Sequence, residues 1–124
     1  MDFTQKDNSE TLYSLAQIEA LAGSDANFVT EIVETFKIST PNYLNLIKEG
    51  LLSNDFIAIQ RAAHQLKPTM EVFAIVGATE RAREIEKCAM QPNPNPSKME
   101  HDFKQLKEIL TAVIQDLEIR FKKN

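Results

Sequence analysis

The chain has 124 residues, 43% of them hydrophobic, with three glycines and no tryptophan, which predicts one globular helical domain rather than a β-rich or disordered chain. Its net charge of −4 argues against a nucleic-acid binder that relies on phosphate contacts, because such domains are usually basic. A lone cysteine, Cys88, excludes an internal disulfide, and no apolar run reaches the length of a signal peptide or a membrane span, so we expect a cytoplasmic protein without membrane contact.

The N-terminal part predicts a flexible segment followed by a short helix. Residues 1–11 are polar and have no hydrophobic period, so we expect them to be flexible, with the folded domain over residues 12–124. Ser14 can cap a helix over Leu15–Ala22, which Gly23 ends. The apolar residues predicted to share one face of it are Leu15, Ile18, Leu21 and Ala22.

The next predicted helix spans about Ala26–Leu52. Asp25 is a suitable N-cap, and apolar residues follow it at helical spacing. Pro41 removes one intrahelical hydrogen bond and crowds the preceding turn, so we expect a kink or a short break near residues 39–40. The apolar spacing resumes directly afterwards, and this favours one kinked helix over two separate ones.

The stretch Asp55–Ala74 predicts the helix around which the rest of the chain is organised. Ser53 and Asn54 form a tight turn before it, and Asn54 or Asp55 caps it. Because the connection is so short, the two helices must lie antiparallel. At about 100° per residue, one face gathers the apolar residues expected in the core: Ile59, Ala62, Ala63, Leu66, Met70 and Phe73.

His64 falls on the opposite face of this helix. It lies about 200° from Leu66 on the helical wheel, so its ring should point into solvent. Ile57 lies about 20° from His64 and two turns earlier, which places an apolar side chain on the exposed face. The polar and compact residues predicted around His64 on this face are Gln60, Arg61, Lys67, Pro68 and Glu71.

Two further helices complete the pattern. Ala78–Met90 turns Ala82, Ile85, Cys88 and Ala89 inward. The prolines of Gln91–Ser97 exclude a helix, so this segment is expected to be a loop, and Ser97 should cap the last helix. The apolar stripe of the last helix comprises Phe103, Leu106, Ile109 or Leu110, Val113, Leu117 and Phe121. The predicted fold is all-α, a four-helix up-and-down bundle with a short N-terminal helix packed across it.

The residues AHQLKPT around His64 resemble the His-x-Leu-Lys signature of histidine-containing phosphotransfer (HPt) domains. The resemblance extends from about Leu12 to Met90. It includes DANFVTEIVETFKISTPNYLNLIKEGLLSNDFIAIQRAAH upstream and GATERAREIEKCA downstream. The chain departs from the family pattern at Pro68, where glycine is common, and in the segment MEVFAIVG. These departures bear on the geometry of docking and on the loop before the third bundle helix.

This resemblance implies a function. In the family, an exposed helical histidine exchanges a phosphoryl group with aspartates of receiver domains in a multistep phosphorelay, a form of two-component signalling. His64 would be the phosphoacceptor, and Lys67 would face the phosphate. The implied partners are a response-regulator receiver domain and a hybrid sensor histidine kinase, and we expect the chain to be a monomer.

The sequence lacks the parts needed to make a phosphoryl donor. It has no glycine-rich phosphate loop and no acidic cluster for Mg²⁺. We therefore predict a carrier without kinase activity, cofactor or metal of its own, with the metal and the acceptor aspartate supplied by the partner. Ile57 is a predicted docking contact, and Gln60, Arg61 and Glu71 form a polar rim beside Pro68. Arg61, one turn before His64, is a second candidate for stabilising the phosphoryl group.

Two alternatives are weighed against the relay. The first is a helical module that binds a receiver or a kinase without accepting phosphate. The second is a bundle enzyme with a metal or cofactor, which needs inward carboxylates and Glu-x-x-His pairs on several helices. The sequence contains no such pairs, and His101 is expected to be solvated near a helix start.

Overall fold

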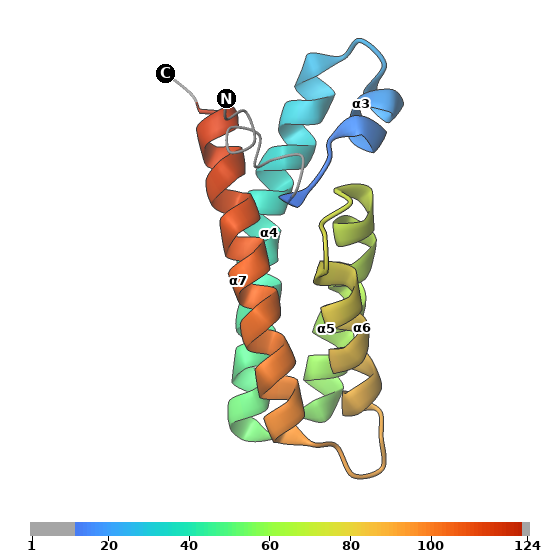
Figure 1. Cartoon of the computed structure of the whole chain (residues 1–124), viewed down its shortest axis with the longest axis vertical. Helices are drawn as coiled ribbons and strands as arrows, with labels where there is room; N and C mark the ends of the chain where they lie inside the picture. The colour runs from blue at the N-terminus through green and yellow to red at the C-terminus, as the bar shows by residue number, and fades with distance from the viewer. Residues whose placement is uncertain (1–11, 123–124) are drawn as a thin grey trace, which may run out of the picture.

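Five helices make up the regular structure of residues 12–122, which the computed structural model describes. Their bounds are α3 (Ala16–Ala22), α4 (Ala26–Ser53), α5 (Phe56–Val72), α6 (Ala78–Ala89) and α7 (Pro96–Arg120). Each long helix packs on the next one in the chain, and α7 packs back on α4 (Figure 1). The predicted all-α, up-and-down bundle is therefore confirmed. The predicted flexible segment, residues 1–11, lies outside the described residues.

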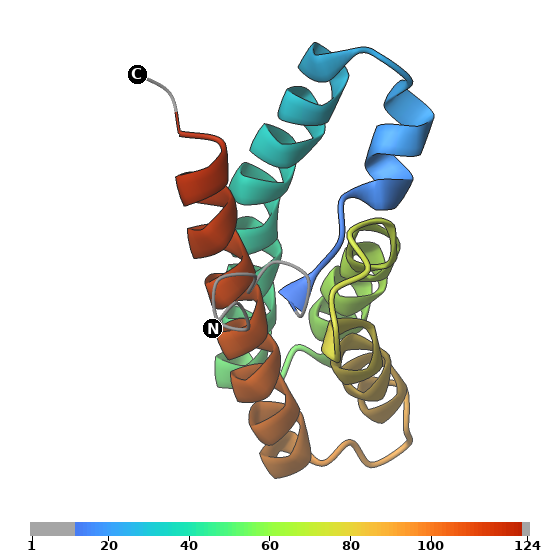
Figure 2. The same ribbon diagram turned by 45° about the horizontal axis from the view of Figure 1, so that its top comes forward.

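The short helix α3 lies beside the N-terminal end of α4, at one end of the bundle (Figure 2). The N-cap position is Leu15, which has no side-chain cap hydrogen bond, so the predicted cap, Ser14, lies one residue too early. The Oγ atom of Ser14 still accepts a hydrogen bond from the Ala16 amide at 3.1 Å. Ile18 is buried, but Leu21 is 69% exposed, so the prediction that Leu21 shares the buried face is wrong. The helix is two turns long and packs mainly on α4, so only the narrow strip through Ile18 is covered.

Tyr13 joins the segment before α3 to the far end of the chain. Its hydroxyl donates to Asp116 Oδ2 at 2.6 Å and accepts from Arg120 Nη1 at 3.1 Å. Burial and the Asp116 hydrogen bond raise the pKa of Tyr13 to about 12. The next residue, Ser14, donates its amide to the Phe73 carbonyl at 2.8 Å. The chain before α3 is thus held against both α7 and the end of α5.

The helix α4 runs without a break from Ala26 to Ser53 and contains Pro41. Asp25 caps it as predicted, accepting hydrogen bonds from the amides of Asn27 and Phe28. The break considered near residues 39–40 does not occur, and the single-helix interpretation is confirmed. A proline removes only one hydrogen bond of a helix, and this helix is buried on both sides of it, at Thr40 and Leu44.

The core face predicted for α5 is confirmed in full. Its side chains are each at most 3% exposed: Ile59, Ala62, Ala63, Leu66, Met70 and Phe73. Asp55 caps the helix, accepting from the Ala58 amide at 3.2 Å, and α5 continues through Pro68 to Val72. Phe73 stacks on Phe36 of α4 with ring centroids 4.4 Å apart, which ties the end of α5 to α4.

Gly50 permits the close approach of α4 and α5 near their connection. A Cβ atom at this position would lie 2.6 Å from Ile59 Cγ1 and 3.1 Å from the Asp55 carbonyl oxygen. We expect Gly50→Ala to lower the free energy of unfolding by about 1–2 kcal/mol, because overpacking outweighs the better helix propensity of alanine. Urea unfolding measures this change in the free energy of unfolding. Lys48→Ala, an exposed change on the same helix, should stay within about 0.5 kcal/mol, and a Gly50 variant as stable as the wild type would contradict the packing.

The connection between α6 and α7 differs from the prediction. The helix α7 begins at Pro96, and its N-cap is Asn95, which accepts from the Lys98 amide at 3.2 Å. Ser97 is therefore inside the helix, and its prediction as the cap is wrong. Proline is well suited to the first helical position because its φ angle is already helical and it has no amide hydrogen to satisfy. The final proline of the loop thus starts the helix.

Candidate functional site

His64 lies on the side of α5 that faces away from the core. Its side chain is 62% exposed, whereas Ala63, the preceding residue, is fully buried. The helix around it is anchored by the buried face described above, so the imidazole is displayed on a rigid element. Its Nδ1 atom lies 2.8 Å from Oε2 of Glu86 on α6. The ring is therefore accessible and also held at one nitrogen.

Glu86 gathers three side chains of α5 on one carboxylate. Besides His64, Lys67 Nζ lies 2.6 Å from its Oε1, and Gln60 Nε2 donates to its Oε2 at 3.2 Å. The Glu86 side chain is only 11% exposed and that of Lys67 22%. A buried carboxylate needs such partners, because an unpaired charge away from water is strongly unfavourable.

The charge state of Glu86 follows from these contacts. Burial acts to raise its pKa, but hydrogen bonds from Lys67, Gln60 and His64 outweigh burial, so the net effect lowers the pKa of the carboxyl group. Glu86 is thus ionised at neutral pH and can only accept hydrogen bonds. The His64 contact therefore requires a proton on Nδ1. In the neutral ring this leaves Nε2 with the free lone pair.

The other residues of the predicted site lie around this cluster. Ile57 is 66% exposed, and Arg61, Pro68 and Glu71 are also exposed. Arg61 forms no ion pair within residues 12–122, so it differs from Lys67. Gln60 is half-buried and turned toward Glu86.

The family of the chain that carries this site follows from its match to a family model. The family model of the Hpt domain matches residues 31–116, which is more than half of the chain. The chain belongs to the Hpt domain family. No curated protein and no solved structure matches the chain. An Hpt domain acts as a carrier in phosphotransfer within a phosphorelay, and the match includes His64, Lys67 and Glu86.

The site residues predicted for this Hpt domain from its sequence did not include Glu86. A signal for it exists on α6, where Glu86 follows Ala82 by four residues and precedes Ala89 by three, so all three share a face. Both alanines are buried. A carboxylate between two buried small residues indicates a charge that must find partners on a neighbouring helix. The sequence does not show which helix supplies them.

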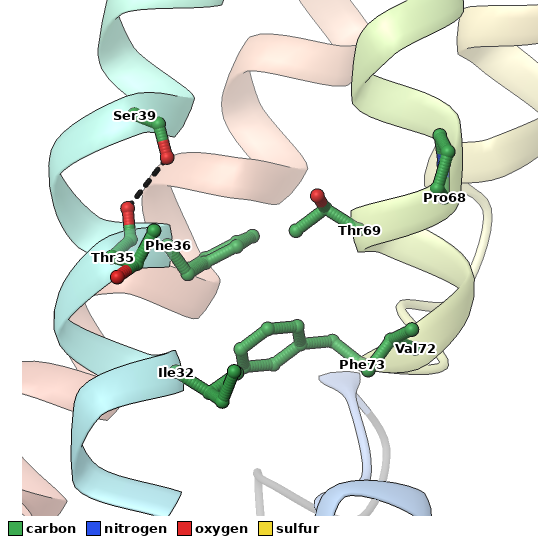
Figure 3. A pocket seen from close by; sticks show the side chains of 8 residues that line it. All are labelled: Ile32, Thr35, Phe36, Ser39, Pro68, Thr69, Val72 and Phe73. Carbon is green, nitrogen blue, oxygen red and sulfur yellow. Dashed lines mark hydrogen bonds between the residues drawn. The ribbon is translucent and has the colours of Figure 1, made fainter. Parts of the chain in front are cut away.

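An apolar groove lies between α4 and α5, and Pro68, one turn after His64, forms part of its lining. Its volume is about 260 Å³. Figure 3 shows Phe36 and Phe73 facing each other from the two sides. The remaining lining residues are Ile32, Thr35, Ser39, Thr69 and Val72. Apolar surface therefore continues from the His64 side of α5 toward α4 in the Hpt domain.

In the part of the chain that the structure describes, no group of three or more His, Cys, Asp or Glu side chains is arranged to hold a metal ion. Among the helices of residues 12–122, none has both the length and the apolar character required to cross a membrane.

Proposed function

We propose that His64 is the phosphoacceptor of this Hpt domain and exchanges a phosphoryl group with the aspartate of a response-regulator receiver domain. The observation that supports this proposal best is the imidazole itself, which is 62% exposed while its Nδ1 atom is bound by Glu86. A nucleophilic nitrogen has to be unprotonated and reachable. The geometry favours Nε2 for that role, because Nδ1 carries the proton.

The transfer step forms one bond and breaks one. The lone pair on His64 Nε2 attacks phosphorus of the aspartyl phosphate on the receiver. The bond between phosphorus and the aspartate oxygen breaks as the nitrogen–phosphorus bond forms, and the aspartate leaves with the electron pair. The receiver supplies the aspartate and its metal ion, so the Hpt domain contributes the acceptor nitrogen, the orientation of the ring and nearby positive charge.

Lys67 is the residue we assign to stabilising the phosphoryl group. It follows His64 by three residues, which places the two side chains as neighbours on the helix surface. An ammonium group has three donors, and the contact with Glu86 occupies one of them. The others are free to bind phosphoryl oxygens while Glu86 keeps the side chain beside the ring. Arg61 is more exposed and has no such anchor, so its contribution should be smaller.

The surface around His64 suits a receiver domain. Exposed Ile57 lies two turns before His64, and the groove lined by Pro68, Thr69 and Val72 begins one turn after it. Apolar contacts on both sides of a central polar group, with Arg61 and Glu71 at the rim, are typical of protein interfaces. We infer that a receiver covers this surface during transfer and that a hybrid sensor histidine kinase carries the upstream receiver.

Ile57→Asp tests the docking surface. The change removes an apolar contact and introduces a charge into the proposed interface, so we expect receiver affinity to fall about tenfold or more. Because Ile57 is 66% exposed, helicity measured by circular dichroism should be unchanged. Calorimetric titration with the receiver measures the affinity. Ile119→Asp, at a site on α7 that is 75% exposed, is the matched control. Equal affinities of wild type and Ile57→Asp would remove Ile57 from the interface.

Labelling from a receiver tests the function itself. The chain is mixed with a receiver domain that carries a radiolabelled aspartyl phosphate. Label should move to the chain and should be stable in alkali but lost in acid, as expected for a nitrogen–phosphorus bond. A chain that binds the receiver and acquires no label would instead be a binding module that acts independently of phosphorylation.

A further inference from the structure

The partner of His64 Nδ1 is a charged carboxylate. A backbone carbonyl or a side-chain amide oxygen could also accept a hydrogen bond from Nδ1 and fix the same tautomer. A carboxylate does more, because it favours a positive charge on the ring it contacts. Glu86 therefore matters most when the ring becomes cationic, and phosphorylation creates such a state.

We propose that Glu86 is a positioning residue that holds the proton on Nδ1 of phosphorylated His64 and thereby shortens the lifetime of the phosphohistidine and speeds its onward transfer. This inference rests on the proposed function of His64. The role inferred for Glu86 is exerted through the imidazole ring, and it is separate from the contact that Glu86 makes with Lys67.

The chemistry depends on the leaving group. When Nε2 attacks phosphorus while Nδ1 keeps its proton, the product is a phosphorylated imidazolium. In the next step the nitrogen–phosphorus bond breaks, its electron pair returns to Nε2, and a neutral imidazole leaves. The phosphoryl group goes to an aspartate oxygen or to water. If Nδ1 had lost its proton, the leaving group would be an imidazolate anion, which is far poorer. Holding this proton thus promotes donation and hydrolysis together.

The contacts of Glu86 keep it in place for this role. Lys67 binds Oε1, whereas His64 and Gln60 bind Oε2, so the lysine does not displace the ring from its oxygen. The side chain is 11% exposed, which limits screening of its charge by water. Charge-assisted hydrogen bonds are about twice as strong as neutral ones. On that basis, removing the charge while keeping an acceptor should lengthen the phosphohistidine lifetime about fivefold.

Glu86→Gln is the decisive variant, because it retains an oxygen that accepts from Nδ1 and removes the charge. Wild type and variant are phosphorylated with phosphoramidate, a small donor that needs no receiver, and freed of reagent. Loss of the phosphohistidine signal is then followed by phosphorus NMR at one neutral pH. We expect the Glu86→Gln signal to decay about fivefold more slowly. Glu84→Gln is the control, since it makes the same change on the same helix without a contact to His64, and it should decay like the wild type.

A second measurement uses the wild type alone. Nitrogen chemical shifts of the phosphorylated His64 ring should show a protonated Nδ1. Equal lifetimes of wild type and Glu86→Gln, or an unprotonated Nδ1 in the phosphorylated wild type, would overturn the role of Glu86 and leave His64 as the phosphoacceptor. If phosphoramidate leaves His64 of the wild type unmodified, the proposed function fails and this inference fails with it.

Discussion

The His64→Gln variant is expected to acquire no phosphoryl group from a labelled receiver, a complete loss of transfer. The amide of glutamine has no nucleophilic nitrogen, so no nitrogen–phosphorus bond can form. Glutamine is close to histidine in size and is a good helix former. Since the side chain is 62% exposed, the fold should be retained. Transfer of label in rapid-quench samples, together with a thermal unfolding curve, measures both properties.

The second histidine of the chain provides the matched control. His101 is also exposed and lies on a helix, α7, but it makes no contact with Glu86 or Lys67. His101→Gln should therefore be labelled at the wild-type rate. Equal labelling of the His64→Gln variant and the wild type would move the phosphoacceptor role to another residue. Labelling lost in the His101 variant alone would make His101 that residue.

Lys67→Met is expected to slow phosphoryl transfer to His64 about 10- to 100-fold, the second largest effect on activity. Removing one preorganised cation or donor from a site where negative charge is stabilised commonly has an effect of this size or larger. The side chain is only 22% exposed, so methionine is chosen because it preserves the packing of the lysine stem. Rates of labelling from the phosphorylated receiver, at saturating receiver, measure the effect on the transfer step.

Two comparisons separate the phosphate role of Lys67 from its contact with Glu86. Arg61→Met removes a cation one turn before His64 on the same face. It should change the transfer rate less than about threefold, because an exposed charge is screened by water and salt. The stability of Lys67→Met is recorded by urea unfolding, since Glu86 loses its ion pair. Transfer at the wild-type rate in a folded Lys67→Met chain would assign Lys67 a structural role only.

Much of the fold was predictable because helices impose a fixed rotation on each residue. At about 100° per residue, the sequence alone identified the buried face of α5 from Ile59 to Phe73 and the exposed position of His64. The cap of α4 was predictable because Asp25 was the single candidate. For α5 the sequence left Asn54 and Asp55 open, and the structure has Asp55. The start of α7 was predicted less well, because Asn95 and Ser97 are both good caps.

The candidate site was predictable only in part, and the reason is geometric. His64 and Lys67 are three residues apart on one helix, so their proximity follows from helical geometry and from sequence alone. Glu86 is 22 residues after His64, on a different helix. Which face α6 turns toward α5 depends on how the two helices pack, with Ala82 and Ala89 both buried. The sequence alone thus determined that an exposed histidine and a lysine lie side by side. Only the packing of α6 against α5 determined which carboxylate binds both of them.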